Sequence, residues 1–316
     1  MALITKYGTI WGAIPTTAGR VFWVAPTAAY TVEGRSYPAS DDNDGLSPER
    51  ALRTVNRAAT VLVTANAGDV VVMLPGTHVL TAAITASIAG VTYMGLPSGA
   101  GNRMRQKTVV QATASAACFA ITATDVELAY LHMVPTTANS AVTISAAGSR
   151  GYVHHCSFDM YTAVASTSTR GINATGAAAN VLIEQCVFHN AGAQGEAMVL
   201  TALTDSQVQD CDIYSQSGVW AAAMLVGAAT ARVQIKRCNF APSGTTATMT
   251  IGISGTGADI AGGIFVTDCL FASSAAGHVI RAIDGFGATT LEAVNNYFAF
   301  TDITTSVGST LVILTN

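Results

Sequence analysis

The segment Val181-Leu182-Ile183-Glu184-Gln185-Cys186-Val187-Phe188 decides the fold, because its pattern returns along the chain. Two apolar residues alternate with other residues, a two-residue polar bend follows, and a marker residue leads into a second short apolar stretch. The markers are Leu131, Cys156, Cys186, Cys211, Cys238, Cys269 and Asn296, at spacings of 25, 30, 25, 27, 31 and 27 residues. No such unit could bury its apolar face alone, so the repeat predicts stacked neighbours in a solenoid.

Other repeat architectures fit this pattern poorly. A propeller blade needs about 40 residues or more, and leucine-rich repeats contain many more leucines. Variable spacing around a constant strand pattern indicates loops of different length on one face. We therefore predict an all-β fold, a parallel β-helix built as a single-stranded solenoid of about seven to eight rungs.

The repeat resembles the right-handed parallel β-helix of the pectate-lyase-like family, in which an asparagine ladder lines the turn between two strands. In this chain cysteine takes the ladder position five times, with asparagine only at Asn296. The runs 44–58 and 68–77 also resemble the N-terminal signature of that family. The resemblance covers about residues 35–300 and implies the right-handed fold. It implies little about activity, because this fold occurs in lyases, hydrolases and non-enzymatic virion proteins.

Composition narrows the function classes. Only 11% of the 316 residues are charged, against about 25% in an ordinary soluble domain. Fifteen basic and nineteen acidic residues give a net charge of −4, which argues against a nucleic-acid partner. The apolar runs are too short or too polar to span a membrane, and the N-terminus lacks the pattern of a secretory signal. A charge-poor surface points to assembly with other proteins.

The pattern divides the chain into four parts. We predict an N-terminal arm over 1–30, a lead-in segment with a capping helix over 31–65, the β-helix over 66–300 and a capping or inter-subunit tail over 301–316. Ser47 can cap the helix and Pro48 suits its first position. Residues with helical spacing would form its buried face, namely Ala51, Leu52, Val55, Ala58, Ala59 and Leu62.

The cysteines are expected to be reduced, apolar ladder residues. Equivalent side chains in a stack run parallel, and the sequence contains no CxxC pair. The acidic run 41–45 resembles a calcium loop, but Ala51 stands where an EF-hand needs a bidentate Glu. We prefer a solvated turn to a metal site at His154 and His155. No metal and no cofactor is predicted.

Catalysis in such a fold needs acids clustered on one sheet face. The candidates are Asp159, Glu184, Asp210, Asp212 and Asp268. Glu184, Asp210 and Asp268 could form a loose stripe with His155 and Lys236. With about one acid per rung, we expect solvated edges, no catalytic residue and no enzyme.

An aromatic arm outside the repeat indicates docking. Trp11, Phe22 and Trp23 are the predicted partner-binding residues. Together these features resemble a tailed-bacteriophage virion protein, most like a capsid decoration or cement protein. That resemblance implies a location on the virion capsid surface after synthesis in the host cytoplasm, with the major capsid protein as partner. A homotrimer is expected because β-helix virion proteins commonly form one.

Two alternatives stay open. A tailspike or receptor-binding β-helix would act on host polysaccharide as a lyase or hydrolase, and loss of Glu184, Asp210 or Asp268 would then abolish cleavage. A free sugar-binding β-helix would show an aromatic platform, for which only Trp220, Tyr161 and Tyr214 are available.

Overall fold

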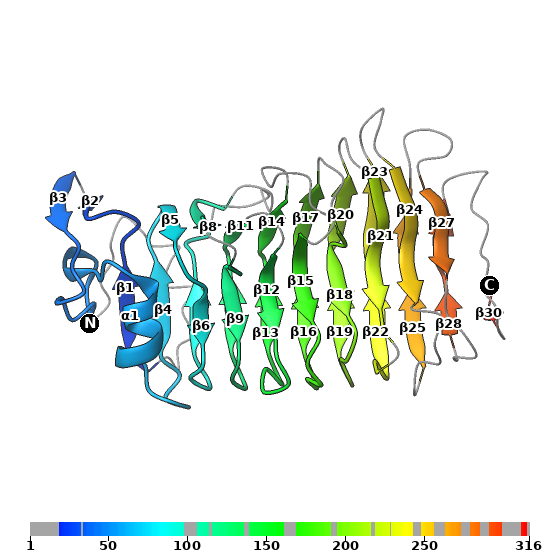
Figure 1. Ribbon diagram of the computed structural model, residues 1–316, viewed down its shortest axis with the longest axis horizontal. Helices are drawn as coiled ribbons and strands as arrows, with labels where there is room; N and C mark the ends of the chain where they lie inside the picture. The colour runs from blue at the N-terminus through cyan, green and yellow to red at the C-terminus, as the bar shows by residue number, and fades with distance from the viewer. Residues whose placement is uncertain are drawn as a thin grey trace.

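The chain coils into three parallel sheets that run the length of an elongated solenoid (Figure 1). The computed structural model describes residues 19–32, 34–97, 106–113, 116–135, 139–160, 169–190, 195–215, 219–227, 229–242, 248–255, 263–272, 279–284, 291–298 and 311–314. The sheets contain eleven, nine and eight strands, named here sheet 1, sheet 2 and sheet 3. The predicted all-β parallel β-helix is confirmed.

Each turn of the solenoid adds one strand to each sheet. Sheet 1 contains β1 (Val21–Val24), β4 (Val70–Met73), β7 (Thr92–Met94), β10 (Glu127–Ala129), β13 (Tyr152–His154), β16 (Leu182–Glu184), β19 (Gln207–Gln209), β22 (Val233–Lys236), β25 (Ile264–Thr267), β28 (Leu291–Val294) and β30 (Leu311–Leu314). Sheet 2 contains β5 (Gly76–Leu80), β8 (Thr108–Ala112), β11 (His132–Val134), β14 (Ser157–Asp159), β17 (Val187–Asn190), β20 (Asp212–Ser215), β23 (Asn239–Pro242), β26 (Leu270–Phe271) and β29 (Tyr297–Phe298). Sheet 3 contains β6 (Ile84–Ala86), β9 (Phe119–Ile121), β12 (Ser140–Ile144), β15 (Arg170–Ala174), β18 (Met198–Leu200), β21 (Val219–Val226), β24 (Thr248–Gly255) and β27 (Val279–Asp284).

The sequence repeat corresponds to sheets 1 and 2 and to the bend between them. In that bend the residue before each marker has a left-handed backbone, with φ between 50° and 55°. These residues are Tyr130, His155, Gln185, Asp210, Arg237, Asp268 and Asn295. Non-glycine residues seldom adopt this conformation, and Asn, Asp and His tolerate it best. The polar bend therefore turns the chain from sheet 1 to sheet 2.

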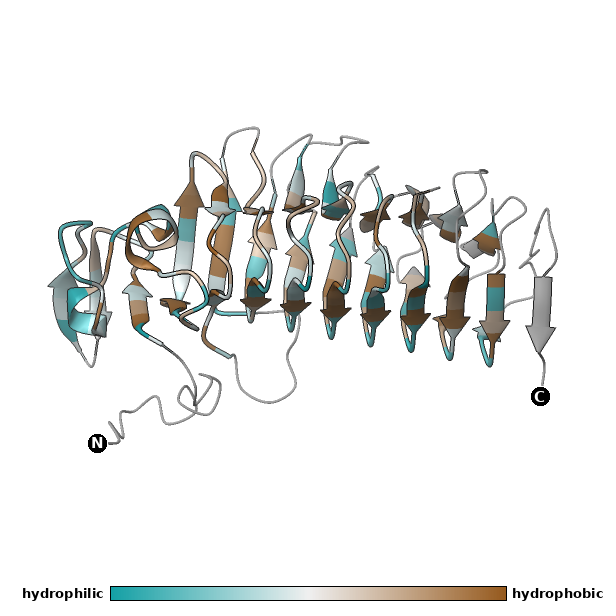
Figure 2. Ribbon diagram, turned by 90° about the horizontal axis from the view of Figure 1, so that it is seen from below, coloured by the Kyte–Doolittle hydropathy of each residue, from teal (hydrophilic) through white to brown (hydrophobic). Residues whose placement is uncertain are grey.

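Inward residues fill the solenoid with one continuous core. Phe158 and Phe188 stack at a centroid distance of 4.5 Å, and Phe240 and Phe271 repeat the contact at 4.8 Å. Figure 2 shows the apolar strands stacked in rows, with hydrophilic residues at the turns. All six cysteines are buried free thiols. Each ladder cysteine lies with its Sγ 3.3–3.5 Å from the carbonyl oxygen two residues before it.

The lead-in helix differs from the prediction. Pro48–Arg50 form a short 3-10 helix (η1), α1 covers only Val55–Arg57, and a π-type turn over Ala58–Leu62 (η2) completes it. The side chain of Ser47 caps nothing, whereas the Thr54 hydroxyl accepts a hydrogen bond from the Arg57 amide. The apolar face is still buried, and η2 packs against β6 at the open edge of sheet 3. The hairpin of β2 (Ala29–Val32) and β3 (Arg35–Pro38) precedes it.

The predicted arm boundary at residue 30 is wrong for residues 21–24, because β1 pairs in parallel with β4 as a strand of sheet 1. β30 likewise pairs with β28 at the other end. The described residues contain no helix long and apolar enough to cross a bilayer.

Asp69 ties β1 to the solenoid. Its carboxylate accepts hydrogen bonds from the Arg20 amide at 2.8 Å and the Thr64 amide at 2.7 Å, and it pairs with the Arg20 guanidinium at 3.0 Å. Burial alone would raise the pKa of Asp69, but these donors outweigh it and the pKa is lowered.

Asp69→Asn is therefore expected to cost about 1–3 kcal/mol at neutral pH, because hydrogen bonds to a charged acceptor weaken. A depressed folded-state pKa stabilises above the unfolded value of about 3.9, and this stability is lost as pH falls through the folded pKa. Urea unfolding at pH 7 and below pH 3 measures the free energy of unfolding of both proteins under the two conditions. A difference between variant and wild type that stays the same in acid would contradict the role of the Asp69 charge.

Candidate functional site

The outer face of sheet 1 presents polar side chains in two rows along the solenoid. In the first row the register places Glu127 opposite Tyr152, and in the second row it places His154 opposite Glu184. The second row continues through Gln209 and Lys236. Because alternate residues of a strand face the same side, both rows point away from the core. We call Glu127, Tyr152, His154 and Glu184 the sheet 1 cluster.

Glu127 is held at one end of the sheet 1 cluster. Its Oε1 lies 2.7 Å from Nε2 of His154, and its Oε2 accepts a hydrogen bond from the Thr92 hydroxyl at 2.7 Å. Burial raises the pKa of Glu127, but the hydrogen bonds from His154 and Thr92 outweigh it, so the pKa lies below its ordinary value. The carboxylate is therefore ionised at neutral pH and can act as a base.

Glu184 is held at the other end. One of its oxygens accepts a hydrogen bond from the Tyr152 hydroxyl, and the other accepts one from Nε2 of Gln209 at 2.6 Å. The Tyr152 ring stacks on His154 at a centroid distance of 4.0 Å. Burial raises the pKa of Tyr152, and the hydrogen bond and charge of Glu184 raise it further. The phenol therefore stays protonated and joins the two ends of the cluster.

The predicted stripe of Glu184, Asp210, Asp268, His155 and Lys236 is divided. Glu184 and Lys236 face outward from strands, whereas the other three form the left-handed bend. Asp210 pairs with the Arg237 guanidinium at 2.8 Å as part of that bend. Similar pairs join Arg150 to Asp125 and Arg232 to Asp205 in the turns that precede the strands of sheet 1. These charged pairs therefore stabilise the turns.

Sequence reasoning missed most of the sheet 1 cluster. Glu127 and Tyr152 were not considered, and His154 was assigned to a solvated turn although its exposed fraction is only 8%. Asp159 and Asp212 lie on sheet 2, away from Glu184. Asp159 instead faces His132 there, with Nε2 and Oδ2 3.8 Å apart.

Two of the three predicted partner-binding residues, Phe22 and Trp23, are buried. Phe22 and Trp23 are 2% and 7% exposed, because both faces of β1 are covered. Trp11 lies outside the described residues. Of the aromatic residues considered for a sugar-binding platform, Trp220 is buried and cannot contact a sugar. Tyr161 is also outside the described residues.

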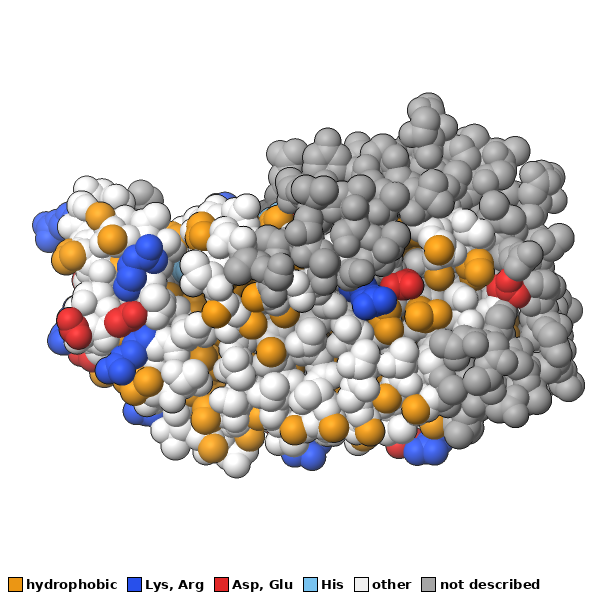
Figure 3. All heavy atoms as spheres, in the orientation of Figure 1, with side chains coloured by type: hydrophobic (Ala, Val, Ile, Leu, Met, Phe, Trp, Pro, Cys, Tyr) orange, Lys and Arg blue, Asp and Glu red, His pale blue; other side chains and the backbone are white. Residues whose placement is uncertain are grey.

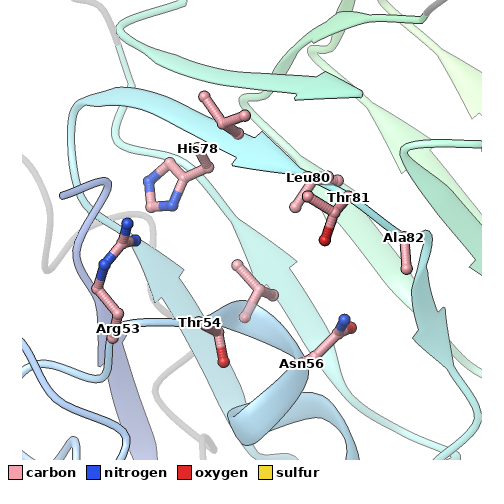
Figure 4. Close-up of a pocket in the computed structure, with 9 residues that line it drawn as sticks. Arg53, Thr54, Asn56, His78, Leu80, Thr81 and Ala82 are labelled. Atoms are coloured by element: carbon pink, nitrogen blue, oxygen red, sulfur yellow. The ribbon is translucent and has the colours of Figure 1, made fainter. Parts of the chain in front are cut away.

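A cavity of about 90 Å³ lies between the lead-in segment and β5 (Figure 4). The Arg53 side chain points toward His78 there, and Nε2 of His78 lies 2.9 Å from the Leu74 carbonyl oxygen. Burial and the nearby Arg53 charge lower the pKa of His78 to about 4. Its described lining contains no carboxylate, so we do not assign acid-base chemistry to it.

Metal ligation has no evident centre in the described residues, where no group of three or more His, Cys, Asp or Glu side chains could hold an ion. In the acidic run 41–45, Asp41 accepts hydrogen bonds from the Arg53 and Thr54 amides, and Asp44 pairs with Arg50 at 3.0 Å. These carboxylates fold the lead-in segment.

Comparison with solved structures identifies similar folds. A rhamnogalacturonan lyase aligns with a TM-score of 0.55 and 14% identity over 88% of this chain and 74% of that chain. A pectin methylesterase from Aspergillus niger aligns with a TM-score of 0.57 and 12% identity over 94% and 90%. The pectate lyase Pel9A aligns with a TM-score of 0.50 and 12% identity over 95% and 69%. No family model and no curated protein matches the sequence.

These likenesses confirm the pectate-lyase-like, right-handed β-helix, and at 11–14% identity they show the fold alone. The expectation that the chain is not an enzyme is contradicted, because these similar structures are polysaccharide-acting enzymes by name. The chain adopts the pectate-lyase-like parallel β-helix fold.

Proposed function

We propose that the chain hydrolyses a polysaccharide on the outer face of sheet 1. The observation that carries the proposal is the pair of carboxylates, Glu127 and Glu184, held by hydrogen bonds within one cluster on that face. Paired carboxylates supply the base and the acid that glycoside hydrolysis needs. The fold shared with polysaccharide-acting enzymes supports this choice of substrate class.

The chemistry assigns different roles to the two carboxylates. Glu127, with its lowered pKa, acts as the base that activates water. Glu184 is the second carboxyl, placed to exchange a proton with the leaving oxygen, and Tyr152 and Gln209 hold it in place. A glycan laid along the solenoid axis would meet a new strand about every 4.8 Å, so neighbouring polar side chains of the second row can contact successive sugars.

The low charge of the chain suits an uncharged or weakly charged glycan. The face of the molecule drawn in Figure 3 carries only scattered charged side chains over its coloured part. A place on a phage capsid, the contact with a major capsid protein and the homotrimer stay predictions from the sequence, as does the tailspike-like role. That last role agrees with cleavage of host polysaccharide.

The proposal is tested by incubating the full chain with a panel of neutral and acidic polysaccharides. We expect new reducing ends with one substrate and no ultraviolet absorbance from unsaturated sugars. An absorbing product would replace hydrolysis by elimination. No cleavage of any substrate, in a panel that includes the surface polysaccharides of candidate bacterial hosts, would overturn the proposal.

A further inference from the structure

Sheet 2 brings a serine, a histidine and an aspartate together on its outer surface. His132 and Ser157 lie directly opposite each other on β11 and β14. Asp159 follows Ser157 by two residues on the same strand and therefore points to the same side. Nδ1 of His132 is 2.7 Å from the Ser157 hydroxyl, and Nε2 is 3.8 Å from Oδ2 of Asp159. One imidazole thus contacts a hydroxyl with one nitrogen and faces a carboxylate with the other.

This arrangement favours the tautomer that a general base needs. With its hydrogen on Nε2, facing Asp159, His132 leaves Nδ1 free to accept the hydroxyl proton of Ser157. A single water can bridge the 3.8 Å gap, and such contacts tighten when substrate binds. Burial lowers the pKa of His132; the Asp159 charge opposes this effect and a charged His189 adds to it. The imidazole is therefore neutral at pH 7.

A small cavity lies over these residues. It has a volume of about 50 Å³ and is lined by His132, Ser157, Phe158, Asp159, Val187 and His189. A water needs about 10–15 Å³ of such space, so the cavity admits a group of a few heavy atoms. Ser157 itself is only 3% exposed, which excludes bulky groups from its hydroxyl.

We propose that Ser157, His132 and Asp159 form a second catalytic site, which removes acetyl-sized acyl groups from alcohol oxygens. His132 takes the hydroxyl proton as Oγ of Ser157 attacks the ester carbonyl carbon. The tetrahedral intermediate collapses, and the leaving alkoxide receives that proton from His132. Water, activated by the same imidazole, then cleaves the acyl-serine to a carboxylic acid and free Ser157. His189 also lines the cavity.

The serine–histidine–aspartate roles match a known catalytic arrangement, but the two imidazole nitrogens are exchanged. The geometry requires only that one nitrogen meets the hydroxyl and the other the carboxylate. This site lies on a different sheet from Glu127 and Glu184, so acyl release and chain cleavage are separate activities.

The test uses the full chain and p-nitrophenyl esters. We expect hydrolysis of the acetate well above that of the octanoate, since the cavity is small. Ser157→Ala should lower the acetate rate at least about 100-fold. Ser140→Ala, a matched control on β12 with a serine 4% exposed, should leave the rate unchanged.

Labelling tests the same site without a variant. Methanesulfonyl fluoride, whose sulfonyl group is acetyl-sized, should add one methanesulfonyl group to the wild-type chain with loss of fluoride, and mass spectrometry of peptides should locate it at Ser157. An unlabelled Ser157, or equal acetate rates in wild type and Ser157→Ala, would overturn the proposal. The Glu184→Gln variant should retain full esterase activity, so failure of one site does not imply failure of the other.

The pH profile separates catalysis from packing. Rate should fall in acid as His132 becomes protonated, with a midpoint below 6.5, the ordinary histidine value. Asp159→Asn removes a charge that favours the protonated imidazole, so its acid limb should move to lower pH and its rate should fall about 10-fold or more. A profile that Asp159→Asn leaves in place would contradict the positioning role of Asp159.

Discussion

Truncating Phe188 to alanine is expected to destabilise the solenoid by about 3–5 kcal/mol, the usual cost of a large cavity in a core. Phe188 is fully buried and stacks on Phe158 with an interplanar angle of 2°. The close packing shows at Gly171, where an added Cβ would lie 2.6 Å from the Phe188 ring and 2.7 Å from the Ala197 carbonyl oxygen. The residues around Phe188 are already packed against backbone atoms, so they cannot move to fill the cavity that alanine would leave.

The measurement is urea unfolding followed by circular dichroism. The matched control is Phe265→Ala, because Phe265 points outward from β25 and is only partly buried. We expect the control to lose less than about 1 kcal/mol. A solenoid is stabilised by contacts between neighbouring rungs, so a defect at a central rung weakens both halves. Equal losses in the two variants would show that the phenylalanine stack does not stabilise the core.

The stacked phenylalanines explain why the fold was predictable from sequence. Inward positions such as Val181, Ile183, Cys186 and Phe188 repeat with the same spacing around each marker, and a buried face tolerates little variation. The third sheet was not predicted, because β15 and its neighbours lie in stretches of Ala, Gly, Ile and Thr whose distance from the marker varies. The lead-in helix was predicted too long, since tertiary packing at the edge of sheet 3 outweighs the helical periodicity of residues 47–62.

The sheet 1 cluster could have been found from the same alignment. His154 and Glu184 stand two residues before the markers Cys156 and Cys186, and Glu127 and Tyr152 stand four residues before the markers Leu131 and Cys156. The register confirms that each set forms one row. The predicted stripe mixed two residues of the second row, Glu184 and Lys236, with bend residues, where the backbone is left-handed. An outward strand residue and a bend residue are neighbours in the sequence, but their side chains point in different directions. The predicted stripe therefore joined side chains that do not lie together.

Contacts within the rows could not be read from the sequence. The hydrogen bond between Tyr152 and Glu184 depends on rotamers of long side chains, and burial of His154 depends on its neighbours Tyr130 and Tyr152. Burial of Phe22 and Trp23 depends on β1 pairing with β4, a contact between segments about 50 residues apart. An aromatic segment near a terminus therefore has two solutions, docking on a partner or completing its own sheet, and here residues 21–24 complete the sheet.

Replacing Glu184 by glutamine is expected to lower the rate of polysaccharide cleavage by about 100- to 10,000-fold, the usual contribution of a general acid or base. Glutamine keeps the size of the side chain and can still accept a hydrogen bond from Tyr152, so the fold should survive. Asp205→Asn is the matched control, because Asp205 is an acid in the turn before β19 and pairs with Arg232. Its cleavage rate should equal that of the wild type.

A spectroscopic measurement separates a catalytic Glu184 from a structural one. The charge and hydrogen bond of Glu184 raise the pKa of Tyr152, in addition to burial, so Glu184→Gln should lower that pKa. The phenolate absorbance of the variant would then develop at lower pH than in a Glu127→Gln variant, where the direct hydrogen bond to Tyr152 remains. A shifted Tyr152 titration together with an unchanged cleavage rate would make Glu184 a structural residue. We expect the cleavage rate to be lost and the Tyr152 titration to shift, while the unfolding midpoint stays unchanged. That result would show that the Glu184 carboxyl acts in catalysis and is not needed for the fold.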